Sequence, residues 1–134
     1  MKRSHLVIIV QARLESQRFP NKILAPLLGQ PMLLWTLDRL QRVRESHTTV
    51  VAMPATGAAS YEAQHLLQRH GYACMLVTGE ANDVLARFAC VAAETEATEI
   101  VRVCGDSPLV DPGVIDDIVT YHRWHSGHPE YTGM

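Results

Sequence analysis

The chain has 134 residues, the usual length of one domain, and its 47% hydrophobic and 19% charged residues can build a folded core, which excludes a disordered chain. A formal net charge of −2 argues against nucleic-acid binding through a basic surface, and no apolar run approaches the roughly 20 residues that span a membrane. Three cysteines without CxxC spacing predict neither a disulfide scaffold nor a structural zinc site, and they favour a reducing cytoplasm.

The first half of the chain predicts two strands separated by a loop and a helix. Leu6–Val10 is a run of apolar residues, typical of a strand that is buried on both faces. A polar loop follows over residues 11–22, and Pro31 then precedes a helical apolar pattern over Met32–Arg44. A second strand is predicted over Thr48–Met53.

The second half continues this alternation of strands and helices. Its predicted elements are a helix from an N-cap at Ser60 to His70 with Gly71 beyond it, a strand over Tyr72–Val77, a helix from Asn82 or Asp83 through Glu94, a strand over Glu99–Val103, and a helix from Pro112 to about Trp124. The alternation predicts an α/β fold, a three-layer Rossmann-like parallel sheet in one domain over residues 1–134. A four-stranded sheet of this kind leaves an open edge beside its fourth strand, which allows association into a homodimer.

The first third of the sequence is its most cationic part and contains the loop after the first predicted strand. Residues 1–44 hold eight of the twelve cationic residues and only two of the fourteen acidic ones. Arg13, Arg18 and Lys22 lie within this loop, and guanidinium and ammonium groups are common phosphate ligands. The loop matches neither GxxxxGK[ST] nor GxGxxG. It is therefore either a phosphate-binding loop of another kind or an ordinary solvated basic loop.

Carboxylates follow two of the other predicted strands. Asp106 comes at the end of the fourth strand, where it could hold Mg²⁺ together with substrate phosphates or could simply serve a turn. Asp111 is better explained as a helix N-cap, and Asp83 as either a cap or a ligand contact. Ligands of open parallel sheets bind beyond the carboxyl ends of the strands, so we expect the basic loop and Asp106 to face one crevice.

Four segments in this order resemble the cytidylyltransferases that make CMP-sugars. These include the CMP-KDO synthetases, the acylneuraminate cytidylyltransferases and, most similar, the spore-coat polysaccharide biosynthesis protein F group. The matching positions are Ala12, Arg13, Ser16, Arg18, Pro20 and Lys22; Leu24, Leu27, Gly29, Pro31 and Met32; Asp83, Val84, Leu85 and Arg87; and Arg102, Gly105, Asp106, Pro108, Leu109 and Asp111. The resemblance covers the length of this chain and roughly the N-terminal half of a family member.

The resemblance implies a glycosyltransferase-A-like nucleotidyltransferase fold that binds CTP and Mg²⁺ and transfers CMP to a sugar in surface polysaccharide biosynthesis. It implies Lys22 and Arg13 as catalytic residues and Asp106 as the metal ligand. The nucleotide-binding positions that it implies are Ala12, Arg13, Ser16, Arg18, Lys22, Asp83 and Asp106. Two alternatives stay open: a truncated, non-catalytic nucleotide-binding module, and a nucleotidyltransferase or glycosyltransferase that uses another nucleotide.

Overall fold

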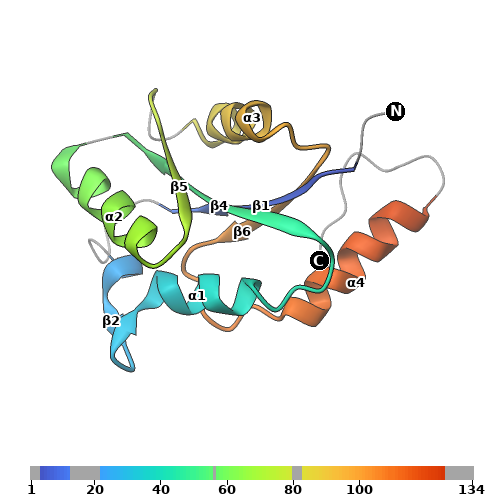
Figure 1. The fold of residues 1–134 in the computed structure, drawn as a ribbon, viewed down its shortest axis with the longest axis horizontal. Helices are drawn as coiled ribbons and strands as arrows, with labels where there is room; N and C mark the ends of the chain where they lie inside the picture. The colour runs from blue at the N-terminus through green and yellow to red at the C-terminus, as the bar shows by residue number, and fades with distance from the viewer. Residues whose placement is uncertain (1–3, 13–21, 56, 80–82, 126–134) are drawn as a thin grey trace.

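A computed structural model describes residues 4–12, 22–55, 57–79 and 83–125 (Figure 1). Its elements are β1 (Leu6–Gln11), η1 (Lys22–Leu24), β2 (Pro26–Leu27), β3 (Gln30–Pro31), α1 (Met32–Leu40), β4 (His47–Pro54), α2 (Gly57–Arg69), β5 (Ala73–Val77), α3 (Val84–Thr95), β6 (Glu99–Cys104) and α4 (Pro112–Trp124). The predicted alternation of strands and helices is confirmed.

The main sheet has four parallel strands in the order β5-β4-β1-β6. β1 lies between β4 and β6, with Ile9 opposite Val50 on one side and Arg102 on the other. Residues 7–10 of β1 have no exposed surface, because helices cover both faces of this central strand. The interpretation of this run as a doubly buried strand is therefore confirmed.

The helices form a layer on each face of the sheet (Figure 1). On one face, α3 packs Phe88 and Val91 against β1 and β4. On the other face, α1, α2 and α4 contribute to the larger core cluster the residues Leu33, Leu34, Leu37, Leu40, Ala63, Leu67, Ile115 and Val119. The expected three-layer α/β architecture is confirmed, and β6 is an edge strand of the described sheet.

Local side-chain chemistry sets the helix ends where the sequence predicts it. The Asp83 carboxylate accepts a hydrogen bond from the Ala86 N–H at 3.1 Å and caps α3. The Asp111 carboxylate accepts one from the Gly113 N–H at 2.8 Å and caps α4. Gly71 follows α2 with φ of +84°, the left-handed conformation that glycine adopts at little cost.

Two predicted helix bounds are wrong for reasons that lie outside the local sequence. The helix predicted to reach Arg44 ends at Leu40, and beyond it the Asp116 carboxylate of α4 accepts the backbone N–H groups of Arg44 and Glu45 at 3.0 Å. The second predicted helix begins at Gly57 rather than after Ser60. Ser60 is buried inside α2 and so is not the residue at which this helix begins.

A small hairpin between η1 and α1 has no counterpart among the predicted elements. Its strands, β2 and β3, have two residues each and pair antiparallel around Leu28 and Gly29, both of which have positive φ. The indole N–H of Trp35, in α1, donates to the Leu27 carbonyl and ties the hairpin to the helix. Such short strands carry no alternating apolar pattern from which they could be predicted.

Candidate functional site

The carboxyl ends of β1 and β6 are joined at Gly105. Gln11 lies opposite Cys104 in the register, and the Gly105 N–H donates to the Gln11 carbonyl at 2.8 Å. A Cβ atom at Gly105 would lie 3.1 Å from that carbonyl oxygen and 3.2 Å from Cδ1 of Leu33, so a side chain would force these neighbours to move. The loop after β1 and the turn after β6 therefore begin side by side, as the sequence predicted.

Ala12 is the first residue of the loop that follows β1. It is buried, and its N–H donates to the Ala52 carbonyl of β4 at 3.1 Å. The origin of the loop is thus fixed from both neighbouring strands, by Ala52 of β4 and by Gly105 after β6. Of the other predicted site residues in this loop, Arg13, Ser16 and Arg18 lie outside the described residues, and Lys22 is described only as the first residue of η1.

The turn that carries Asp106 is held by hydrogen bonds within the turn and from α1. The Ser107 N–H donates to the Cys104 carbonyl at 3.2 Å, and the buried Thr36 hydroxyl of α1 donates to the Gly105 carbonyl at 3.1 Å. Asp106 is exposed at this edge. The prediction that Asp106 lies in a turn is confirmed, while binding of a metal and of a nucleotide by Asp106 stay predictions.

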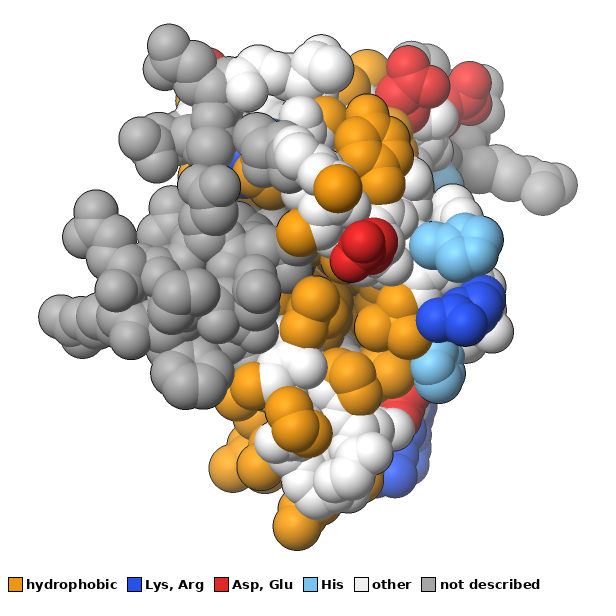
Figure 2. All heavy atoms as spheres, turned by 90° about the vertical axis from the view of Figure 1, so that its left-hand side faces the viewer, with side chains coloured by type: hydrophobic (Ala, Val, Ile, Leu, Met, Phe, Trp, Pro, Cys, Tyr) orange, Lys and Arg blue, Asp and Glu red, His pale blue; other side chains and the backbone are white. Residues whose placement is uncertain are grey.

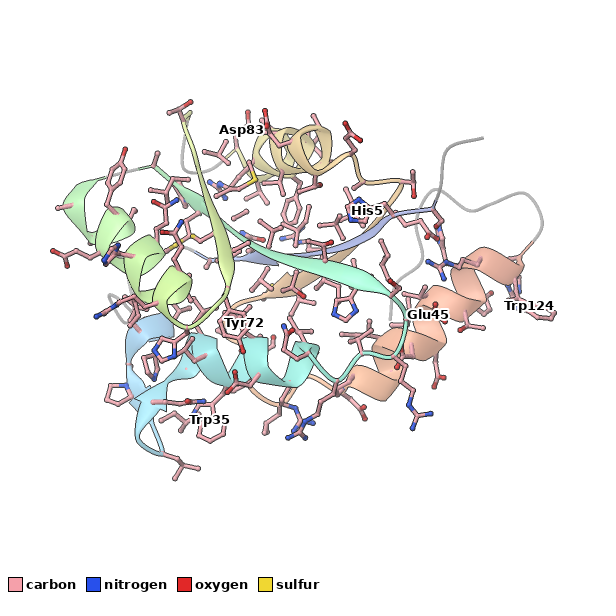
Figure 3. All side chains as sticks on the ribbon, viewed as in Figure 1. His5, Trp35, Glu45, Tyr72, Asp83 and Trp124 are labelled. Atoms are coloured by element: carbon pink, nitrogen blue, oxygen red, sulfur yellow. The ribbon has the colours of Figure 1, made fainter. Side chains whose placement is uncertain are left out.

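Asp83 lies at the start of α3, the helix that packs against β1 and β4. It precedes the first residue of that helix, Val84, and Figure 3 shows its position there. Arg87, one turn further along, is almost fully buried. Figure 2 faces the side of the molecule on which the strands end, where hydrophobic side chains gather over the centre and basic and histidine side chains lie at one margin. The capping role of Asp83 is confirmed, and its contact with a nucleotide stays a prediction.

A polar contact that was not predicted lies at the same edge. The Arg102 side chain of β6 donates through Nη2 to Oε1 of Gln11 at 2.7 Å, and its guanidinium carbon lies 5.4 Å from the centre of the Phe88 ring. The period of two along a strand could have found it, because Arg102 and Cys104 fall on the face opposite to Val103. Arg102 entered the sequence argument only as a matching motif position.

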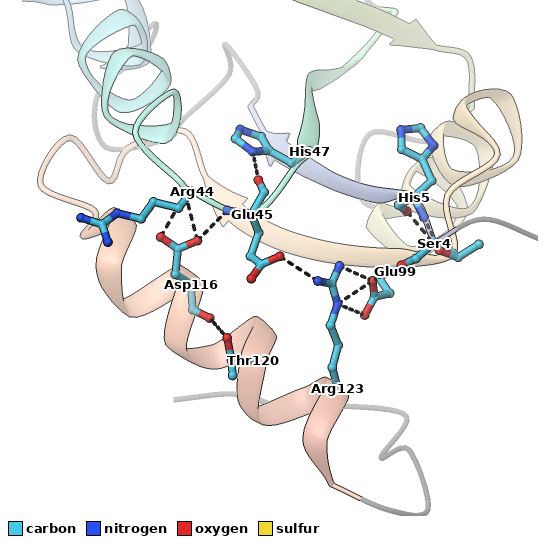
Figure 4. Close-up of polar contacts among 10 residues, drawn as sticks. Ser4, His5, Arg44, Glu45, His47, Glu99, Asp116, Thr120 and Arg123 are labelled. Carbon is cyan, nitrogen blue, oxygen red and sulfur yellow. Dashed lines mark hydrogen bonds and ion pairs between the residues drawn. The ribbon is translucent and has the colours of Figure 1, made fainter.

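The opposite, amino edge of the sheet carries an ion-pair network (Figure 4). Arg123 of α4 contacts Glu99 at 2.7 Å and Glu45 at 2.8 Å. Hydrogen bonds from Arg123 hold the pKa of Glu99 below its usual value of 4.5, against the opposing effect of burial. Hollows of about 260 and 480 Å³ lie around this network. They are lined by Ser4, His5, Leu6, Glu45, Ser46, His47, Thr48 and Arg123, and by Ser4, Thr98, Glu99, His122 and Arg123.

Within residues 4–12, 22–55, 57–79 and 83–125, no three or more histidine, cysteine, aspartate or glutamate side chains are grouped so that they could hold a metal ion. The cysteines are free, and burial raises the pKa of the Cys74 thiol to about 12. Among the helices that the structure describes, none is long and apolar enough to cross a membrane.

The fold resembles those of several solved proteins. A cytidylyltransferase from Leptospira borgpetersenii is 27% identical and has a TM-score of 0.84, over 93% of this chain and 51% of its own. A CMP:2-keto-3-deoxy-manno-octonic acid synthetase complexed with CTP is 23% identical with a TM-score of 0.80, over 90% of this chain and 48% of its own. A Mycobacterium tuberculosis protein complexed with manganese is 22% identical with a TM-score of 0.62, over 87% of this chain and 59% of its own.

This chain therefore spans about half the length of the first two of these proteins. A sequence profile described as cytidylyltransferase matches residues 7–127, which is most of the chain and includes all elements from β1 to α4 except the first residue of β1. The matched region holds the β1–β6 junction, the loop after β1, and the turn with Asp106. The chain belongs to the cytidylyltransferase family.

Proposed function

We propose that residues 1–134 are the nucleotide-binding part of a cytoplasmic cytidylyltransferase, which binds CTP with Mg²⁺ and transfers CMP to a sugar in surface polysaccharide biosynthesis. The observation that carries this proposal is the bond of 2.8 Å from the Gly105 N–H to the Gln11 carbonyl. This bond joins the starting points of two segments at one edge of the sheet. One is the loop whose sequence holds three cationic residues, and the other is the turn with the exposed carboxylate of Asp106. The solved relative that holds CTP has this fold and supports the choice of nucleotide.

In this proposal the loop after β1 surrounds the triphosphate. Arg13, Arg18 and Lys22 supply positive charge to its oxygens, while Ala12 and Ser16 bring backbone and hydroxyl groups close to it. Lys22 and Arg13 are the catalytic residues, since they would stabilise charge that grows on the departing pyrophosphate. Asp83 contributes a further nucleotide contact from the start of α3.

Asp106 is the proposed ligand for Mg²⁺, and the described residues fit that ion. Mg²⁺ in nucleotide sites is usually held by one or two carboxylates together with substrate phosphates and water. An exposed carboxylate beside a triphosphate loop meets this requirement without a cluster of protein ligands. When bound, the ion would neutralise phosphate charge. The relative solved with manganese supports a divalent cation in proteins of this fold.

The proposed reaction is a substitution at the α-phosphorus of CTP. A sugar hydroxyl oxygen forms a bond to that phosphorus, the bond to the β-phosphate oxygen breaks, pyrophosphate leaves, and the hydroxyl proton goes to solvent or to a base. The residues of this chain would act mainly by holding the triphosphate in line and by stabilising charge. The fixed origins of the two loops, at Ala12 and Gly105, serve this positioning.

The test combines nucleotide binding and turnover. We expect CTP with Mg²⁺ to bind more tightly than UTP, ATP or GTP in calorimetric titrations, and pyrophosphate to appear when 3-deoxy or amino sugars are added. A chain that binds none of the four nucleotides at millimolar concentration overturns the proposal. Preference for another nucleotide would leave the phosphate site and correct the base.

A second candidate function is a nucleotide-binding module without catalysis. The two candidates differ in one result. The module binds CTP with Mg²⁺ but releases no pyrophosphate with any acceptor, whereas the enzyme does both.

A further inference from the structure

Arg102 lies on a face of β6 that is open to solvent. Side chains alternate along this strand: Val101 and Val103 pack into the core with α1 and α4, while Ile100, Arg102 and Cys104 lie on the face toward α3. All three of the latter are exposed. A charged side chain here can reach a ligand without first being displaced from a packed core.

The guanidinium of Arg102 is directed toward the carboxyl edge of the sheet. Its own backbone lies opposite Ile9, but its hydrogen-bond partner is Gln11, two residues further along β1. Two residues of a parallel strand advance by about 6.6 Å. The side chain therefore extends along the sheet to the level at which the loop after β1 leaves Gln11 and the Asp106 turn leaves Cys104.

Two contacts hold this guanidinium in place, and neither of them neutralises its positive charge. Gln11 accepts one hydrogen bond, and the guanidinium carbon lies over the Phe88 ring, 5.4 Å from its centre. Both groups are uncharged. A guanidinium has five N–H donors, and within the described part of the chain only Nη2 donates, which leaves donors that can bind two oxygens of one anion.

Arg123, at the opposite edge, provides the contrast. Its side chain contacts the carboxylates of Glu99 and Glu45, which neutralise its positive charge. Among the described residues, Arg102 has no such ion pair. The difference separates an arginine that holds elements of the fold together from one that is positioned for a ligand.

We infer that Arg102, held by Gln11 and Phe88, binds an oxyanion group of the ligand at the carboxyl edge of the sheet. The inference rests on the proposed function, because that function brings anionic ligands to this edge. Two sources share the required chemistry: a phosphate of the nucleotide, and the carboxylate of an acidic sugar acceptor. Arg102 is thus a binding residue additional to Arg13, Arg18 and Lys22.

The experiment measures binding of CTP with Mg²⁺, of cytidine, and of 2-keto-3-deoxy-manno-octonic acid to the full chain by calorimetry. The variants are Arg102→Met, which keeps an apolar contact with Phe88, Arg102→Lys, which keeps the charge, and Gln11→Met, which removes the acceptor. Arg42→Met is the matched control, because Arg42 is an exposed arginine just beyond α1. Thermal unfolding shows that each variant is folded.

We expect Arg102→Met to weaken binding of one anionic probe by about 10-fold or more, Arg102→Lys and Gln11→Met to weaken it less, and Arg42→Met to leave it unchanged. A loss for CTP but not for cytidine identifies a phosphate, and a loss for the sugar acid identifies its carboxylate. Unchanged affinities in a folded Arg102→Met variant overturn the inference alone. An unsubstituted chain that binds neither CTP nor the sugar acid overturns the proposed function and this inference with it.

Discussion

The two edges of the central sheet each carry an arginine, and the two arginines are held in different ways. At the amino edge, Arg123 contacts the carboxylates of Glu99 and Glu45 and so connects α4 to β6 and to the segment before β4. At the carboxyl edge, Arg102 contacts an amide and an aromatic ring. An arginine paired with carboxylates contributes to the stability of the fold, whereas an arginine that contacts no carboxylate among the described residues is suited to a ligand. Variants at the two edges should therefore separate folding from binding.

The largest effect is expected at the carboxyl edge, for turnover. Lys22→Ala should lower the rate of pyrophosphate release from CTP by roughly 10²- to 10³-fold, because one positive charge near the leaving group is lost. Lys2, the other lysine of the chain, provides the matched control Lys2→Ala, with an unchanged rate. Equal rates for Lys22→Ala and the unsubstituted chain would remove Lys22 from the catalytic role.

At the amino edge the next effect is on stability. Arg123→Met should lower the free energy of unfolding by about 1–2 kcal/mol, because Glu99 and Glu45 lose their partner. The partial exposure of these side chains to solvent keeps the effect this small. The CTP affinity of this variant should be unchanged. Chemical denaturation and calorimetry measure the two quantities. A loss of CTP affinity in folded Arg123→Met would contradict the separation of the two edges.

Asp83 tests whether one residue at the carboxyl edge serves both purposes. Asp83→Ala should cost about 1 kcal/mol of stability, because the Ala86 N–H loses its acceptor, while Asp83→Ser keeps a cap and most of the stability. Denaturation curves of the two variants check the cap. If Asp83 also contacts the nucleotide, CTP affinity falls in both variants; unchanged affinity in both would leave capping as its role.

The smallest effect is a pH dependence that belongs to the amino edge. Because the pKa of folded Glu99 lies below its usual 4.5, the unfolded chain binds more protons near that pH. The stabilisation from Glu99 is thus present above about pH 4.5 and is lost as the pH falls through the lower, folded value. Unfolding curves between pH 3 and 6 should show this loss, and Arg123→Met should show less of it. Identical slopes in both proteins would contradict the assignment.

Much of the fold follows from residues that act locally. The apolar run of β1, the caps at Asp83 and Asp111, and Gly71 each indicate their element without reference to the rest of the chain. The bounds that were wrong depend on distant residues. The helix α1 ends early and is followed by backbone N–H groups that bind Asp116, a residue 72 positions from Arg44, and no local pattern contains that contact.

The candidate site divides in the same way. The rule for parallel sheets predicts that the segments after β1 and β6 begin at one edge, and the Gly105–Gln11 hydrogen bond shows that their first residues lie side by side. The Arg102–Gln11 contact depends on the side-chain direction of two strands 91 positions apart, which strand periodicity limits but does not determine. The contacts of Arg13, Ser16 and Arg18 remain predictions from the sequence.

Gly105 has a consequence for how this site can change. Its close approach to Gln11 and Leu33 fixes where the two segments at the site begin. A larger residue at position 105 would therefore displace the ends of β1 and β6 together, and with them the turn that carries Asp106. The absence of a side chain at this one position is thus what allows the two strand ends to lie as close together as they do.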